Sequence, residues 1–251
     1  MHTIEKTLRH LLNNFMKKQT GVPVSIGLDT NLDEVTIDLY NDNVGLIILA
    51  GATASGKSIF HLNLYNQLES LKSDVNIQCI FIDTQLIEFA DWHHHKQLLP
   101  TINKIEEAIK YLESVDVTDK DIKELLVIHI EECDLFMYPA EMKKALQRLL
   151  TANNRNKNRK ICIVYSTSRV YSPTTTPDWL LESASLRLAF KFANSRDIYP
   201  FLEEKISSTP MMTGERIAKS NQGLRYFQPF TTDEVEKLNS WAEEVSTRKD
   251  I

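Results

Sequence analysis

The sequence predicts an α/β protein whose mainly parallel sheet is covered by helices on both faces. Three observations support this prediction. Short uninterrupted apolar runs of the kind that form buried parallel strands recur along the chain, at residues 46–50, 77–82, 125–130, 161–165 and 186–190. Segments with helical periodicity separate most of them, notably 59–71, 102–112 and 140–150. A glycine-rich segment joins the first strand to the first of these helices, which is the context that a phosphate-binding loop requires.

Smaller elements are predicted on both sides of this core. Apolar residues at helical spacing predict an amphipathic helix over residues 4–16, and residues 22–26 and 35–39 predict two short strands of a β-hairpin. Near the end, Thr231 or Thr232 can cap a helix whose first turn carries Asp233 and Glu234. The expected organisation is therefore an N-terminal helix in 1–19, one main domain in 20–230 and a C-terminal helix in 231–251.

Composition excludes several classes of protein. The 251 residues are 42% hydrophobic and 25% charged, and no apolar run reaches the ~20 residues that cross a bilayer. The N-terminus lacks the uninterrupted apolar core of a secretory signal, so we expect a cytoplasmic protein without a membrane span. Cys79, Cys133 and Cys162 lie in or beside apolar runs and are expected to be buried thiols. The net charge of −5 disfavours bulk attraction to nucleic acid and leaves only a local contact.

The strongest motif is a P-loop of the form G-x-x-x-x-G-K-[ST], also called Walker A. Glycines allow the main chain to wrap closely around phosphates, lysine offers a compact cation to the β and γ groups, and serine presents a hydroxyl to Mg²⁺. The motif therefore predicts a site for ATP with Mg²⁺. The residues expected to bind the nucleotide are Gly51, Ala52, Thr53, Ala54, Ser55, Gly56, Lys57, Ser58 and Ile59.

A second motif is the apolar strand 125–130 followed by two carboxylates, Glu131 and Glu132, which is typical of a Walker B strand. The first acid is expected to hold the Mg²⁺ shell together with Ser58, through water, and the second to act as general base on the attacking water. An exposed acidic turn after a buried strand is the alternative interpretation.

A third strand, 161–165, runs into hydroxyl-bearing residues and an arginine. Because the carboxyl ends of parallel strands meet at the ligand crevice, Thr167 or Ser168 could sense the γ-phosphate. The alternative interpretation is that these residues form a simple turn at the end of the strand. The basic segment 153–160 is interpreted as a solvated loop or as a contact to a phosphate backbone. His93, His94 and His95 are adjacent, so their side chains point apart, and we predict a surface loop there rather than a metal site.

Taken together, these segments resemble the FtsK/SpoIIIE family of DNA-translocating motors. The stretch VPVSIGLD and the strand ending in DL precede the P-loop in the family's order, IEECDLFM at 130–137 is similar to its IDEFADLM, and IVYSTSR at 163–169 is similar to its LVLATQR. The similarity continues through SASLRLAFKFANSRD at 183–197 and GERIAKSNQGLRYF at 214–227. It covers about residues 22–227.

The resemblance implies a RecA-like P-loop NTPase core and a homo-oligomeric ring, a hexamer by analogy, that threads double-stranded DNA by ATP hydrolysis. It assigns Glu131 and Glu132 as the Walker B acids and Thr167 and Ser168 as the sensor residues. It also places Arg169 and Arg187 at arginines of the family pattern. One of these could complete a neighbouring subunit's site. The chain differs from the family at Ala54 (commonly Gly), at Glu131 (Asp) and at Ser168 (Gln), so slow or partner-dependent turnover is an expected consequence.

Two other functions remain open from the sequence. One is an ATPase of a secretion or conjugation system, whose partner is a protein. The other is an assembly module that binds ATP, forms rings and hydrolyses weakly, which the Walker B departure would permit.

Overall fold

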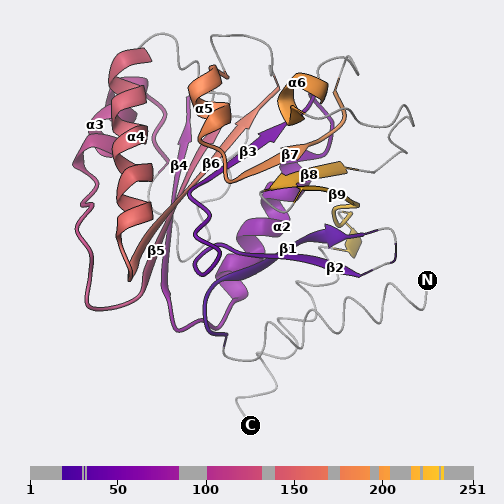
Figure 1. Cartoon of the computed structure of the whole chain (residues 1–251), viewed down its shortest axis with the longest axis horizontal. Helices are drawn as coiled ribbons and strands as arrows, with labels where there is room; N and C mark the ends of the chain where they lie inside the picture. The colour runs from indigo at the N-terminus through magenta and orange to yellow at the C-terminus, as the bar shows by residue number, and fades with distance from the viewer. Residues whose placement is uncertain are drawn as a thin grey trace.

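The centre of the fold is a seven-stranded sheet with the order β4-β5-β6-β3-β7-β8-β9 (Figure 1). This computed structural model describes residues 19–29, 31, 33–84, 101–131, 139–168, 176–192, 198–203, 216–220, 223–231 and 233–234. Five neighbouring strands are parallel, and the last two continue the sheet in antiparallel pairing. The parallel strands are β4 (Asn76–Asp83), β5 (Glu124–Glu131), β6 (Arg159–Thr167), β3 (Leu46–Ala50) and β7 (Leu186–Ala189), and the antiparallel strands are β8 (Arg216–Ser220) and β9 (Gly223–Phe227).

Helices cover both faces of this sheet, as the sequence predicts. Successive residues of β3 alternate between the two faces, so that Leu49 packs in one core cluster and Ile48 in the other. The first cluster contains α2 (Lys57–Ser70), and the second contains α3 (Ile105–Ser114), α4 (Pro139–Arg155), α5 (Asp178–Glu182) and α6 (Ile198–Leu202). Every residue of β3 is buried, which is why its sequence is continuously apolar.

A β-hairpin packs against α2. Its strands are β1 (Pro23–Leu28) and β2 (Glu34–Asp38), paired antiparallel as predicted. The buried amide of Gln67 clamps it to α2, since its Oε1 accepts from the Ser25 N–H at 2.7 Å and its Nε2 donates to the Ser25 carbonyl at 2.9 Å. Leu28 and Gln228 exchange two backbone hydrogen bonds, which tie the hairpin to the end of β9. The hairpin is therefore part of the same structural unit as the sheet.

The basic segment 153–160 differs from the loop that the sequence predicts. Residues 153–155 belong to α4, and β6 begins at Arg159. The Asp119 carboxylate accepts backbone N–H groups of Lys157, Asn158 and Arg159, which lowers the pKa of Asp119 to about 2. Lys160 donates to the Asn156 carbonyl at 2.6 Å, and burial lowers its pKa. Part of the positive charge is thus committed to internal contacts, at the edge of the sheet where the parallel strands begin.

The structure also tests the predictions for two of the cysteines and for the helix cap at Thr231. Cys79 and Cys162 are buried free thiols, and burial raises the pKa of each to about 12. Thr231 caps its segment as predicted, because its Oγ1 accepts the Glu234 N–H while the Glu234 carboxylate accepts the Thr231 N–H at 2.7 Å. The residues of the predicted N-terminal helix, most of those of the predicted C-terminal helix, Cys133 and the histidines at 93–95 lie outside the described residues.

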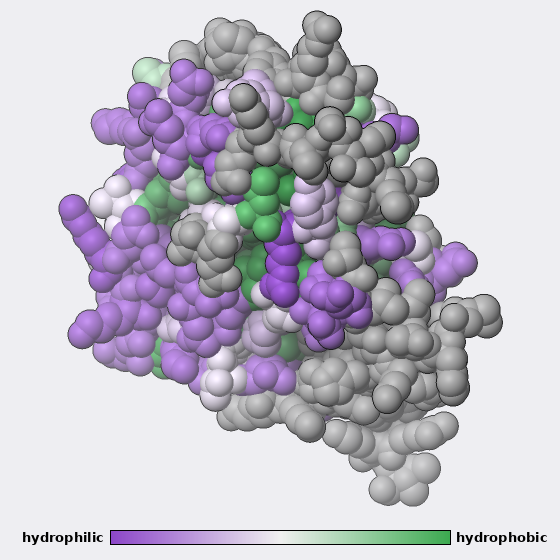
Figure 2. Space-filling model, turned by 45° about the vertical axis from the view of Figure 1, so that its right-hand side comes forward, coloured by the Kyte–Doolittle hydropathy of each residue, from purple (hydrophilic) through white to green (hydrophobic). Residues whose placement is uncertain are grey.

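The described surface is mainly polar. On the face in Figure 2, hydrophilic residues dominate, and hydrophobic residues show mostly in a hollow near its centre. Among the described residues, Ile122 and Tyr199 are the large hydrophobic side chains with substantial exposure, at 60% and 50%. In the part of the chain that is described, no helix has the length and apolar character needed to cross a bilayer.

Candidate functional site

The glycine-rich loop lies where the sequence places it, between the end of β3 and the start of α2. Its backbone is anchored to both neighbouring strands. The Gly51 N–H donates to the Thr167 carbonyl at the end of β6 (3.2 Å), and the Ala52 N–H donates to the Lys191 carbonyl just beyond β7 (2.9 Å). The loop therefore sits at the carboxyl edge of the parallel strands, where ligands bind in open α/β sheets.

The loop adopts a conformation that depends on small residues. A Cβ at Gly51 would lie 2.6 Å from the Cβ of Phe190 and 2.8 Å from the Ser55 Oγ, and both distances are shorter than a Cβ can adopt without a shift of its neighbours. Gly56, which precedes the first turn of α2, has φ 99°, and Ala54 has φ 60°. Positive φ costs a residue with a Cβ about 1–3 kcal/mol. The departure from the family's glycine at Ala54 therefore places some strain in the loop.

The side chains of the loop suit a triphosphate with its metal. The Lys57 Nζ is buried and donates to the carbonyls of Gly51 (2.8 Å) and Ala52 (3.4 Å), which holds the cation inside the curve of the loop. The Ser55 Oγ is buried without a hydrogen-bond partner among the described residues. Ser58 is exposed on the first turn of α2, where a hydroxyl can face a metal. The N-terminus of α2 adds a favourable field for anions.

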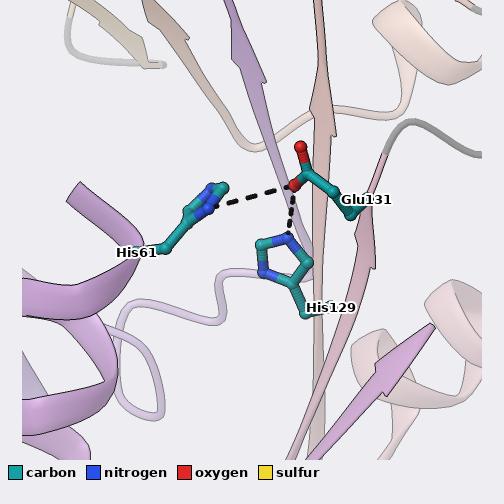
Figure 3. Close-up of side chains that lie close together, drawn as sticks. All are labelled: His61, His129 and Glu131. Atoms are coloured by element: carbon teal, nitrogen blue, oxygen red, sulfur yellow. Dashed lines mark hydrogen bonds and ion pairs between the residues drawn. The ribbon is translucent and has the colours of Figure 1, made fainter. Parts of the chain in front are cut away.

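Glu131 ends β5, which is separated from β3 by β6. Its carboxylate is buried, with His129 Nε2 at 3.0 Å and His61 Nδ1 at 3.9 Å from Oε2 (Figure 3). The prediction that it holds the Mg²⁺ shell stays a prediction. Asp83, buried at the end of β4, lies in register beside it, and the sequence reasoning missed this carboxylate as well as both histidines. Glu132 lies outside the described residues.

Thr167, one of the two sensor candidates, contacts the loop through its backbone. It pairs in register with Ala50, its side chain is fully buried, and its carbonyl holds the Gly51 N–H. Ser168 follows at the strand end and is partly exposed, while Arg169 lies outside the described residues. The strand order thus brings the end of β6 between the P-loop and the strand that carries Glu131.

Arg187, the second candidate arginine, is buried on β7. Its guanidinium donates to the carbonyls of Phe201 and Leu181, each at 2.8 Å, and forms an ion pair with Glu203 at 3.3 Å. These contacts join β7 to the C-terminal ends of α5 and α6. Within one chain the side chain is therefore engaged in a structural role, and its action in a neighbouring subunit's site stays a prediction.

Arg216, on β8, is the cation beside the loop that the sequence reasoning did not assign. Its guanidinium donates to the Ser55 carbonyl and lies over the Phe190 ring, 5.2 Å from the centroid. Burial lowers its pKa. The only sequence signal was its place in the family-like segment 214–227, because only the sheet pairing of β7 with β8 brings it to the P-loop.

Substituting Arg216 with alanine is expected to lower the free energy of unfolding by about 1–3 kcal/mol, because a charged donor to a buried carbonyl is lost. The measurement is urea unfolding followed by circular dichroism. Arg225→Ala is the matched control, since this arginine is 54% exposed on β9 and lies 3.8 Å from Asp29; exposed pairs contribute about 0–1 kcal/mol. If both variants lost the same free energy of unfolding, a supporting role of Arg216 under the loop would be contradicted.

A cavity of about 660 Å³ lies elsewhere, between the hairpin and the strands β7 and β8. Val44, Ser185 and Ser220 are among its lining residues, which places it at the edge where β3 and β7 begin. It is therefore separate from the P-loop, which lies at the other edge of the same strands. The convergent backbone and side-chain groups described above, rather than cavity size, identify the candidate site.

Comparison with known proteins shows the fold. No family model matches the sequence, and no curated protein matches it. The pCW3 conjugation coupling protein TcpA, in its monomer form with ATPγS, is 17% identical over 91% of this chain and 72% of its own, with a TM-score of 0.64. EssC (ATPases 2 and 3) from Geobacillus thermodenitrificans is 12% identical over 91% of this chain and 50% of its own, with a TM-score of 0.63.

EccC (ATPases 2 and 3) from Thermomonospora curvata, in complex with a signal sequence peptide, is 16% identical over 84% of this chain, with a TM-score of 0.58. This chain spans 41% of that structure and 26% of the EccC cytoplasmic domain. The shared feature is the P-loop ATPase fold, which confirms the predicted RecA-like core.

Proposed function

We propose that this chain, whose fold is that of FtsK/SpoIIIE-type ATPase domains, binds and hydrolyses ATP with Mg²⁺ and uses the energy to move double-stranded DNA. The observation that carries the nucleotide part is the P-loop at the carboxyl edge of the sheet, with the Lys57 Nζ held inside its curve by two loop carbonyls. The resemblance in sequence to DNA-translocating motors supports the DNA part.

Each residue of the site has a distinct role in this proposal. The backbone of the loop and Lys57 bind the phosphates, and Ser58, with Glu131 through water, holds the metal. Bound Mg²⁺ neutralises charge on the phosphates. Glu132 takes the proton of the attacking water, and Thr167 or Ser168 orients that water or the γ-phosphate. From the family resemblance we propose a homo-oligomeric ring, a hexamer by analogy, in which Arg169 or Arg187 of a neighbouring copy neutralises charge across the subunit interface.

A secretion or conjugation ATPase is the second candidate. Structures with this fold include EccC, a type VII secretion ATPase whose ATPases 2 and 3 are bound to a signal sequence peptide, and a conjugation coupling protein. The net charge of −5 and the internal engagement of Lys160 weaken the case for a strong DNA surface in one subunit. The partner of such an ATPase would be a protein. A weakly hydrolysing assembly module is the third candidate, because Glu131 replaces the usual aspartate.

Added duplex DNA is expected to raise the ATPase rate severalfold, and DNA binding is expected to weaken steeply with salt because phosphate contacts release counterions. The assay compares the rate with no partner, with duplex DNA and with a signal-sequence peptide, and the mass of the assembly is measured in ATP. Stimulation by peptide alone would favour secretion. A ring without turnover under any of these conditions would favour the assembly module and contradict the motor.

A further inference from the structure

Two imidazoles and a carboxylate form a buried cluster between α2 and the sheet. His129 and Glu131 lie two residues apart on β5 and so face the same side, toward α2. His61 comes from the second turn of α2, one helical turn after Lys57. Figure 3 shows the two rings converging on the same carboxylate oxygen. Both histidines are fully buried, and Glu131 is 7% exposed.

The spacing of these atoms fits a metal ion. His129 Nε2 lies 3.0 Å and His61 Nδ1 3.9 Å from the Glu131 Oε2, and one ligand atom from each residue lies within 4.8 Å of the others. An ion bound at about 2.0–2.2 Å to nitrogen and oxygen ligands keeps neighbouring ligand atoms roughly 3–3.5 Å apart. Small side-chain rotations therefore bring all three groups to one ion.

Tyr65 provides the outer contact that metal-binding histidines usually have. Its hydroxyl lies 2.7 Å from His129 Nδ1. When Nε2 binds a metal, Nδ1 carries the hydrogen and donates to the Tyr65 oxygen, which fixes the ring and its tautomer. The His61 and His129 rings also pack edge to face, with centroids 4.4 Å apart. The Tyr65 contact and this ring packing orient the two histidines beside Glu131.

We propose that His61, His129 and Glu131 bind a divalent transition metal of the Zn²⁺ class, with the remaining position open to water. Two imidazoles with one carboxylate suit Zn²⁺ and Co²⁺, whereas Mg²⁺ and Ca²⁺ prefer oxygen ligands alone. The ligand atoms of this site therefore differ from those of the nucleotide's magnesium site, which are oxygens.

One consequence rests on the proposed function. Glu131 is also the carboxylate expected to serve the nucleotide's Mg²⁺, and one side chain cannot complete both sites at once. An ion between the histidines holds Glu131 away from the nucleotide. Micromolar Zn²⁺ is then an inhibitor of ATP turnover, and a chelator reverses the inhibition.

Cobalt titration of the untagged full chain, without nucleotide, tests the metal site. His93→Gln, His94→Gln and His95→Gln are introduced together as the background, because adjacent histidines can bind metals by themselves. The expected result is that one equivalent of Co²⁺ binds. The bound ion should give visible absorption bands typical of a low coordination number and no sulfur charge-transfer band, and Zn²⁺ should displace it. His129→Gln and His61→Gln, each in this background, are expected to weaken binding by at least roughly 10-fold.

Folding of each variant is checked by circular dichroism. Tyr65→Phe keeps all three ligands and is expected to weaken Co²⁺ binding by roughly 10-fold, which tests the site even where a histidine variant does not fold. Absence of Co²⁺ binding in the background protein, or affinity unchanged in the folded variants, would overturn the proposal. Because no nucleotide is present, this outcome is independent of whether the chain hydrolyses ATP.

Discussion

Replacing Lys57 with alanine is expected to lower the ATP turnover rate by roughly 10²–10³-fold, because a positioned cation at the transferring phosphate is lost. The carbonyls of Gly51 and Ala52 also lose their donor, so the loop loses an internal support. Steady-state phosphate release measures the rate, and fluorescent-nucleotide titration measures binding. Lys110→Ala is the matched control, since this lysine is exposed on α3.

Glu132→Gln separates catalysis from binding in the same assays. The amide cannot accept a proton from water, so turnover should fall as in the Lys57 variant while nucleotide binding is retained. Turnover at the level of the unaltered protein in either variant would refute the assignment of the site. Loss of turnover in both, with binding kept only in Glu132→Gln, is the pattern of an ATPase.

Gly51→Ala is expected to weaken nucleotide binding by roughly 10-fold or more, a loss of about 1.4 kcal/mol or more. The new Cβ would lie 2.6 Å from the Cβ of Phe190, so the start of the loop must move away from the end of β7. The same crowding should lower the free energy of unfolding by about 1–3 kcal/mol. Nucleotide titration and urea unfolding measure the two effects.

Gly223→Ala is the control for this substitution. Gly223 has φ 101°, so alanine there is strained, but no atom lies within 4 Å of the new Cβ. Its stability should fall by a comparable amount of about 1–3 kcal/mol, while nucleotide binding stays unchanged. If both variants lost affinity equally, the effect of Gly51→Ala would be a general consequence of instability rather than of the shape of the loop.

The strands of the parallel core were predictable because they are buried on both faces. Burial on both faces removes any polar alternation, so the runs in β3, β5 and β6 stand out as continuous apolar segments. The observed β3 coincides with its predicted run, and β5 and β6 extend beyond theirs by one or two residues at each end. The P-loop was equally predictable, since its glycines and lysine are required at fixed offsets by the shape of a phosphate group.

Elements with weaker signals were missed. The strands β8 and β9 are short and only partly buried, so RIAKS and GLRYF show no continuous apolar run. The helices α5 and α6 are each five residues long, too short to show a period of 3.6. Arg216 and Asp83 were missed for a related reason, because their neighbours in space come from other strands of the sheet.

The sequence by itself determined the parallel α/β core, the strand-to-helix junction at Gly51 and a set of residue types suited to binding a triphosphate. These features depend on contacts between residues close along the chain, or on burial that affects whole segments. Only the tertiary structure decided which strands are neighbours. That order places Arg216 under the loop, engages Arg187 between α5 and α6, and joins His61 of one helix to His129 and Glu131 of a distant strand, because such contacts arise from packing and leave no periodic pattern in the chain.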